Sequence, residues 1–87
     1  MAYRVELTSG AQRDLSPLPA DVLERVRDRF KDLSENPRFQ GVKKLKGGSG
    51  YLRRRVGDYR ILYEVDDGTR LVTVARVLHR RDAYRRL

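Results

Sequence analysis

Residues 53–65 read RRRVGDYRILYEV, and this stretch decides the fold. Two short runs with strand character flank a Gly-Asp pair, which is typical of a tight turn between antiparallel strands. Because side chains alternate between the two faces of a strand, Arg53 and Arg55 should share one face and Arg54 the other. Arg60, on the second run, joins Arg53 and Arg55 if the register allows. The stretch therefore predicts a β-hairpin that carries a row of permanent positive charges.

Two interpretations of this basic hairpin are open. A row of guanidinium groups on a rigid sheet has the geometry to hold a phosphodiester, because arginine can donate two parallel hydrogen bonds to phosphate oxygens. An ordinary solvated basic surface explains the same residues. The hairpin sequence alone does not separate them.

Length and composition restrict the class of protein. Eighty-seven residues fit one domain with a single small core, so we expect residues 1–87 to form one unit. The chain has no cysteine, which excludes disulfides, thiolate metal sites and a cysteine nucleophile. No apolar run approaches the length of a membrane span, and the N-terminus lacks the apolar segment of a signal peptide. These features predict a soluble, cytoplasmic protein without a membrane partner.

The net charge is +8, and its placement narrows the choice of partner. Residues 1–40 contain seven basic and seven acidic side chains, which cancel. Residues 41–87 contain thirteen basic and five acidic side chains, so the whole excess lies in the second half. A basic half of this kind predicts a polyanionic partner, either nucleic acid or an acidic protein.

The first half of the chain predicts a strand and two helices. Residues 2–8 alternate apolar and polar side chains, which is typical of a half-buried strand. Thr8-Ser9-Gly10 offers a cap for a short helix over about residues 9–16, which a proline-rich segment then ends. A second helix is predicted from Pro19 or Ala20 to Ser34, and Asn36-Pro37 closes it. Its apolar residues recur at helical spacing: Val22, Val26, Phe30 and Leu33.

A basic, glycine-rich connection follows over residues 41–50. It lacks the spacing of a phosphate-binding P-loop and does not lead into a helix, so that interpretation is rejected. We expect a flexible segment whose lysines, Lys43, Lys44 and Lys46, make weak contacts with backbone phosphates.

The second half predicts three strands. The arginine-rich strand and the strand Tyr59–Val65 come first, and Asp66-Asp67-Gly68 then indicates another hairpin. The last strand, about Arg70 to Leu78, is mostly apolar and is therefore predicted to be central in the sheet. The resulting order is βααβββ. We predict an α+β fold in which a helical hairpin packs on a largely antiparallel four-stranded sheet.

Five features together are similar to the RelE/ParE toxin superfamily of type II toxin–antitoxin systems, and the similarity spans essentially the whole chain. They are YRVELT at 3–8, Leu-Pro at 18–19, KLKG at 44–47, RVGDYRILYEV at 55–65 and HRRDAY at 79–84. The resemblance is closer to RelE-type mRNA interferases, which cleave messenger RNA on the ribosome.

The resemblance implies which residues form the catalytic site. RelE-type toxins use basic residues on the second strand of the predicted sheet, an arginine on the third, and an arginine and a tyrosine near the C-terminus. These positions correspond here to Arg53 and Arg55, to Arg60, and to Arg80 and Tyr84. Further RNA contacts are expected from other basic residues of the second half: Lys43, Lys44, Lys46, Arg54, His79 and Arg81.

This sequence departs from the family pattern on the second strand. The two lysines of the best-known member are arginines here, and Arg54 stands between them where an apolar residue is usual. Arginine keeps the positive charge, but it does not deprotonate near neutral pH and cannot serve as a general base. The acid and base roles therefore fall to Tyr84 or to His79, the single histidine of the chain, and Tyr84 can alternatively stack on a base.

RNA cleavage needs no metal if the ribose 2′-OH is the nucleophile. The protein then has to orient that hydroxyl, remove its proton, stabilise the pentacovalent phosphorane and protonate the leaving 5′-oxygen. One histidine and scattered carboxylates do not have metal-ligand spacing, so neither a metal nor another cofactor is predicted.

The resemblance also implies the partners. They are mRNA in the ribosomal A site and an acidic antitoxin encoded beside the toxin. Two other functions stay open. ParE-like members of the superfamily bind DNA gyrase and cleave nothing. The other function is that of a non-catalytic module that binds RNA or the ribosome, or of a toxin that has lost its activity.

Overall fold

The computed structural model describes residues 2–38, 43–44 and 51–81. The order of elements is strand, two helices and four strands. They are β1 (Arg4–Leu7), α1 (Ser9–Leu15), α2 (Ala20–Glu35), β2 (Lys43–Lys44), β3 (Leu52–Val56), β4 (Tyr59–Asp66) and β5 (Leu71–His79). The predicted helices and the strands of 59–65 and 70–78 agree with these bounds to within one residue, which is the usual uncertainty of element ends.

The strands form one sheet in the order β1-β5-β4-β3-β2. β1 pairs with β5 in parallel, and all other neighbours are antiparallel. The predicted α+β class is confirmed, and so is the central position of the last strand. The two-residue strand β2 was not predicted: Lys43 and Lys44 pair with Arg53 and Leu52, where we expected a flexible connection.

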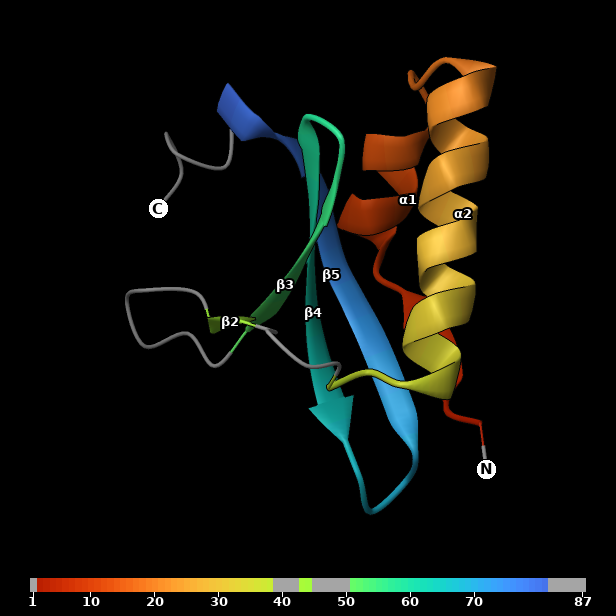
Figure 1. The fold of residues 1–87 in the computed structure, drawn as a ribbon, viewed down its shortest axis with the longest axis vertical. Coiled ribbons are helices and arrows are strands. Elements are labelled where there is room, and N and C mark those ends of the chain that lie inside the picture. Colours follow the sequence, from red (N-terminus) through yellow and green to blue (C-terminus); the bar gives the residue numbers. More distant parts are fainter. Residues whose placement is uncertain (1, 39–42, 45–50, 82–87) are drawn as a thin grey trace.

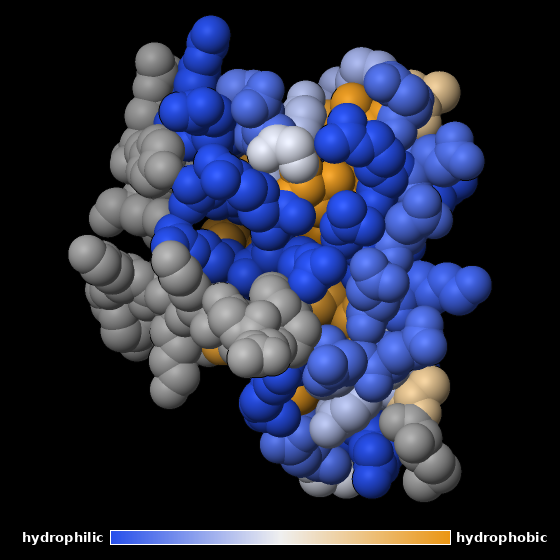
Figure 2. All heavy atoms as spheres, viewed as in Figure 1, coloured by the Kyte–Doolittle hydropathy of each residue, from blue (hydrophilic) through white to orange (hydrophobic). Residues whose placement is uncertain are grey.

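Both helices cover the same face of the sheet, and the main core lies between them and the strands (Figure 1). Residues from every layer are fully buried there, among them Ala11, Val26, Leu33, Ile61, Tyr63, Val72 and Val74. In the space-filling view, hydrophobic atoms show mainly through gaps in a hydrophilic surface (Figure 2). The apolar stripe predicted on α2 belongs to this core. No helix in the described ranges is both long enough and apolar enough to span a bilayer.

The sheet face that points away from α1 and α2 is called the open face below. No helix of residues 2–38 covers it (Figure 1). A second, smaller apolar cluster formed by Leu62, Leu78 and Tyr51 is separate from the main core. Because Leu62 and Leu78 alternate with the core residues Ile61, Tyr63 and Val77 along their strands, this cluster belongs to the open face.

Two different turns connect the long strands. The Gly57-Asp58 turn joins β3 to β4, with Gly57 at a positive φ of 57° as its first central residue. The positive φ favours glycine at this position, and a Cβ there would also lie 3.0 Å from the end of the Arg25 side chain. The predicted hairpin after β4 is confirmed, but the residue at positive φ is Arg70 (52°). The Asp66 carboxylate organises that turn by accepting hydrogen bonds from the backbone N–H groups of the two residues at 68 and 69.

β5 contains a bulge at Ala75. Leu62 lies opposite Arg76 and Tyr63 lies opposite Val74, so no residue of β4 lies opposite Ala75. Such an extra residue shifts the alternation of every later side chain by one position. Val74 before the bulge and Val77 after it therefore both face the helices, although they are three residues apart.

Tyr63 ties the sheet to the segment that follows α2. Its side chain is fully buried, and its hydroxyl donates a hydrogen bond of 2.6 Å to the carbonyl oxygen of Pro37, which is also buried. Burial raises the pKa of the Tyr63 phenol to about 12. The hydroxyl thus stays protonated and acts as a donor throughout the physiological range.

Replacing Tyr63 by phenylalanine should lower the free energy of unfolding by about 1–2 kcal/mol, because the buried Pro37 carbonyl loses its donor. Urea titration measures this change. Tyr59→Phe is the matched control, since the Tyr59 ring is only half-buried and we expect a change below about 0.5 kcal/mol. Equal losses in the two variants would contradict the assignment.

Candidate nucleic-acid interface

The arginines of the β3–β4 hairpin share the open face. Leu52 and Val56 belong to the core under the helices, so Arg53 and Arg55 point to the other side of the strand. Arg60 is the direct cross-strand partner of Arg55. The register that the hairpin sequence left undetermined therefore brings Arg60 beside Arg55.

This pairing is electrostatically unfavourable for the protein alone. Directly opposite residues in an antiparallel sheet have Cβ atoms about 5 Å apart, and like charges there are destabilising by a few tenths of a kcal/mol or more. In the described residues, no carboxylate forms an ion pair with Arg53 or Arg55. A bound anion between Arg55 and Arg60 would remove the repulsion, so the pair is suited to a phosphate group.

An apolar floor lies next to the arginines. Leu62 is the cross-strand partner of Arg53, and Leu78 is the partner of Arg60. These leucines are 4% and 6% exposed, and Tyr51 packs against them. Because an apolar surrounding lowers the effective dielectric constant, attraction between the arginines and a phosphate is stronger there than in bulk water.

Arg80 extends the row from the end of β5. Its backbone N–H donates a hydrogen bond of 2.7 Å to the carbonyl oxygen of Asp58, which continues the β4–β5 ladder beyond the Tyr59–His79 pair. Arg80 is exposed and follows directly on β5, whose residue Leu78 is the cross-strand partner of Arg60. The next residue, Arg81, is exposed, and its backbone N–H donates to Nδ1 of His79 at 3.3 Å.

Two residues predicted to contact RNA lie on the helix-bearing face. Arg54 points towards α2, where its guanidinium lies 3.8 Å from the carboxylate of Asp32. The His79 ring packs edge to face on Tyr59, with ring centres 5.2 Å apart. Alternation along β3 separates Arg54 from the arginine row, and the bulge at Ala75 does the same for His79.

The remaining predicted residues come from the segments around β2 and after β5. Lys43 and Lys44 form β2 and pair through their backbones with β3. Lys46 and Tyr84 lie outside the described residues. In the parts of the chain that the structure describes, no three His, Cys, Asp or Glu side chains are grouped to hold a metal ion.

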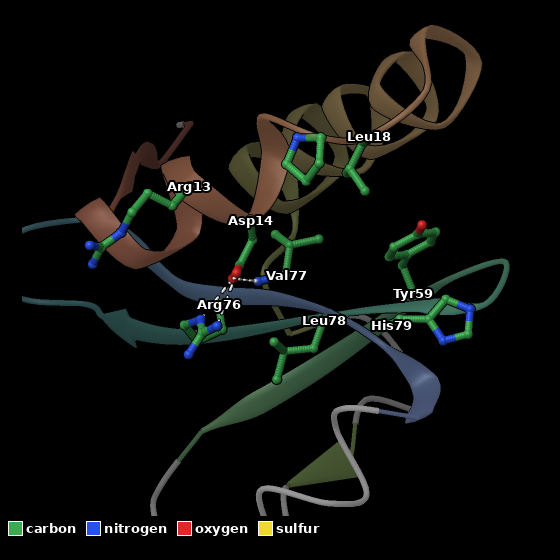
Figure 3. Close-up of a pocket in the computed structure, with 9 residues that line it drawn as sticks. Arg13, Asp14, Leu18, Tyr59, Arg76, Val77, Leu78 and His79 are labelled. Atoms are coloured by element: carbon green, nitrogen blue, oxygen red, sulfur yellow. Dashed lines mark hydrogen bonds and ion pairs between the residues drawn. The ribbon is translucent and has the colours of Figure 1, made fainter.

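A pocket of about 340 Å³ lies on the helix-bearing side, at the end of β5 (Figure 3). Tyr59 and His79 form one end of it, and Asp14 of α1 lies at the other, next to Arg76 and Val77. Neither Asp14 nor Arg76 was predicted to have a role from the sequence. No local pattern could have linked them, because they are 62 residues apart in the chain.

Comparisons with known proteins agree with this architecture. The family model described as "ParE toxin of type II toxin-antitoxin system, parDE" matches residues 5–84. Toxin RelG of Mycobacterium tuberculosis is 41% identical over 87 residues, which cover 99% of this chain and 100% of that protein.

Two solved toxin–antitoxin complexes contain a chain with a similar structure. The RelBE2 complex of M. tuberculosis gives a TM-score of 0.81 at 37% identity and covers 91% of this chain and 99% of that one. The archaeal RelE–RelB complex of Pyrococcus horikoshii OT3 gives 0.79 at 27% identity and covers 92% and 97%. With the family match over residues 5–84, these similarities show that the chain belongs to the RelE/ParE superfamily of toxins from type II toxin–antitoxin systems.

Proposed function

We propose that this toxin is a metal-independent endoribonuclease that cleaves mRNA in the ribosomal A site of the cytoplasm. The observation that carries the proposal is the cross-strand pair Arg55–Arg60 on the open face, beside an apolar floor. Arg53 lies on the same face of β3 as Arg55, and Arg80 follows the end of β5, where its backbone N–H binds the Asp58 carbonyl oxygen. We call Arg53, Arg55, Arg60 and Arg80 the arginine clamp.

The clamp supplies charge at the scissile phosphate. In the proposed reaction the ribose 2′-oxygen attacks phosphorus and loses its proton, and the bond from phosphorus to the 5′-oxygen breaks as that oxygen takes up a proton. The products are a 2′,3′-cyclic phosphate and a 5′-hydroxyl. Guanidinium groups placed around the non-bridging oxygens stabilise the extra negative charge of the phosphorane, and electrostatic stabilisation of this kind often accounts for most of an enzyme's rate enhancement.

Other residues have supporting roles in the proposal. Tyr84 supplies either proton transfer or base stacking, as the family resemblance implies. Lys43, Lys44, Lys46 and Arg81 contact backbone phosphates on either side of the cleaved nucleotide. Arg54 and His79 lie on the opposite face and are therefore placed outside the clamp.

The proposed partner is an acidic antitoxin. RelE-like chains of M. tuberculosis and P. horikoshii were solved as complexes with RelB antitoxins. The entire positive excess of this chain lies in residues 41–87, which include the clamp. An acidic segment that covers the clamp would block access of RNA and lower toxicity.

Gyrase inhibition is the alternative function, because the matching family model describes ParE toxins. A protein that only binds gyrase has no need for two arginines that face each other across a hairpin. A non-catalytic RNA-binding module would likewise need dispersed positive charge and no convergence on one phosphate. The Arg55–Arg60 pair favours the nuclease.

Induced expression of the toxin should stop translation early and yield transcripts cut within the reading frame, because the proposed substrate is mRNA on the ribosome. Primer extension on ribosome-associated RNA detects the cuts. Arg4→Ala should remain fully toxic, since Arg4 is an exposed arginine of β1 outside the clamp. Intact transcripts together with trapped gyrase–DNA complexes would replace this proposal with the gyrase alternative.

A further inference from the structure

The bulge at Ala75 decides which side chains at the end of β5 lie on the open face. Before the bulge, Val72 and Val74 face the helices, and after it Val77 does. Without the extra residue, the alternation would turn Leu78, the cross-strand partner of Arg60, towards the helices. The bulge therefore sets the orientation of the last residues of β5, from which the chain continues to Arg80.

Side chains of the α1 region hold the backbone on both sides of the bulge. β1 pairs with β5 only as far as Val74, so the edge of β5 beyond it is not covered by a strand. The Thr8 hydroxyl donates a hydrogen bond of 2.7 Å to the Ala75 carbonyl oxygen. The Asp14 carboxylate accepts a hydrogen bond of 2.9 Å from the Val77 backbone N–H.

Asp14 also binds the residue between these two positions. Its carboxylate accepts hydrogen bonds from Nε of Arg76 at 2.7 Å and from Nη2 at 2.9 Å (Figure 3). The Asp14 side chain is only 14% exposed, so this bidentate pair is partly shielded from water. A single carboxylate thus fixes both the backbone and the side chain immediately after the bulge.

The close packing of α1 against β5 leaves little room for another register of β5 at the bulge. A Cβ at Gly10 would lie 3.2 Å from the Arg76 side chain and 3.8 Å from the Ala75 carbonyl oxygen. From Val77 the strand continues to His79, and the backbone N–H of the next residue, Arg80, donates a hydrogen bond to the Asp58 carbonyl oxygen on the β4 side. The end of β5 is therefore held between Asp14 and the β3–β4 turn.

We propose that Asp14 is a positioning residue that keeps the bulge in register and so fixes the end of β5, which positions Arg80, the residue that follows it, for the arginine clamp. The inference rests on the proposed nuclease function of the clamp. Asp14 does not reach the clamp itself, because it lies on the helix-bearing side of the sheet (Figure 3). Its effect on catalysis passes through the backbone of residues 76–80.

The test combines cleavage kinetics with amide hydrogen exchange in Asp14→Ala. We expect kcat on ribosome-bound mRNA to fall by about tenfold to a hundredfold, as slight misplacement of a catalytic group typically does. KM should stay within about twofold, because most RNA contacts are untouched. Exchange protection of the Arg80 amide should be lost, while that of α2 is kept.

Three further variants make the result specific. Asp14→Glu should recover most of the rate by restoring the carboxylate. Asp14→Asn keeps the side-chain volume and one acceptor oxygen. It therefore tests the role of the Asp14 carboxylate if Asp14→Ala does not fold. Asp32→Ala is the matched control: it removes another carboxylate that joins a helix to an arginine of the sheet, and should leave kcat unchanged.

An unchanged kcat in folded Asp14→Ala, or an equal loss in Asp32→Ala, would overturn the inference. If the wild-type protein cuts no RNA, the proposed function fails. Amide exchange alone then tests whether Asp14 positions the end of β5. Loss of protection at Arg80 would support the positioning role, and retained protection would refute it.

Discussion

Arg60→Ala should lower the rate of RNA cleavage by about a hundredfold or more, which is the usual effect of removing one donor to a developing oxyanion. Arg60 lies on β4, which is paired on both sides, so its backbone is fixed more firmly than that of Arg80 at the end of β5. RNA binding should weaken only slightly, because many basic residues share the phosphate contacts.

Single-turnover cleavage and the affinity for a model RNA, measured at one fixed salt concentration, separate these effects. The thermal midpoint of Arg60→Ala, measured in parallel, separates an effect on folding from an effect on cleavage. Arg4→Ala serves as the control for loss of an exposed arginine on another strand. A large loss of affinity with a normal rate at saturating RNA would assign Arg60 to binding and not to the chemical step.

A 2′-deoxy substitution at the cleaved nucleotide should abolish cleavage, because the proposed reaction has no other nucleophile. Binding of the deoxy substrate should remain close to normal, since the phosphates that meet the arginine clamp are unchanged. The unmodified substrate should leave a 2′,3′-cyclic phosphate, which mass spectrometry of the 5′ fragment identifies.

The matched control places the same 2′-deoxy change two nucleotides away from the cleaved position, where the rate should be unaffected. A chelator of divalent ions should not alter the chemical step, provided that the ribosomes remain assembled. Efficient cleavage of the deoxy substrate would exclude internal attack, even though the family and the fold would stand.

Most of the fold could be predicted from local signals. The alternation of residues 2–8, the helical spacing of residues 22–33 and the Gly57-Asp58 turn each depend on neighbours in the sequence. The capping role of Thr8 is confirmed by the 3.1 Å hydrogen bond that its hydroxyl accepts from the Ala11 N–H. These local preferences agree with the tertiary packing, which is why the element bounds were close.

The bulge and the short strand β2 could not be predicted, because they depend on distant contacts. Ala75 meets Thr8 across 67 residues, and Lys43 pairs with Arg53 in a segment that has the composition of a loop. The candidate site could therefore be predicted only in part. Alternation was enough to group Arg53 and Arg55, whereas the face of His79 depends on the bulge and could not be inferred from spacing.

The position of β5 has a consequence for the order in which the molecule folds. β5 supplies Val72, Val74 and Val77 to the core and pairs with the first strand of the chain. Contacts of such long sequence separation form late, because the entropy of closing the intervening loop is lost before they contribute. During synthesis the N-terminal residues emerge first, so α1 and α2 have no completed sheet to pack on until β5 has been made. Arg80 directly follows this strand, so the proposed arginine clamp lacks its fourth member until β5 has paired with β4.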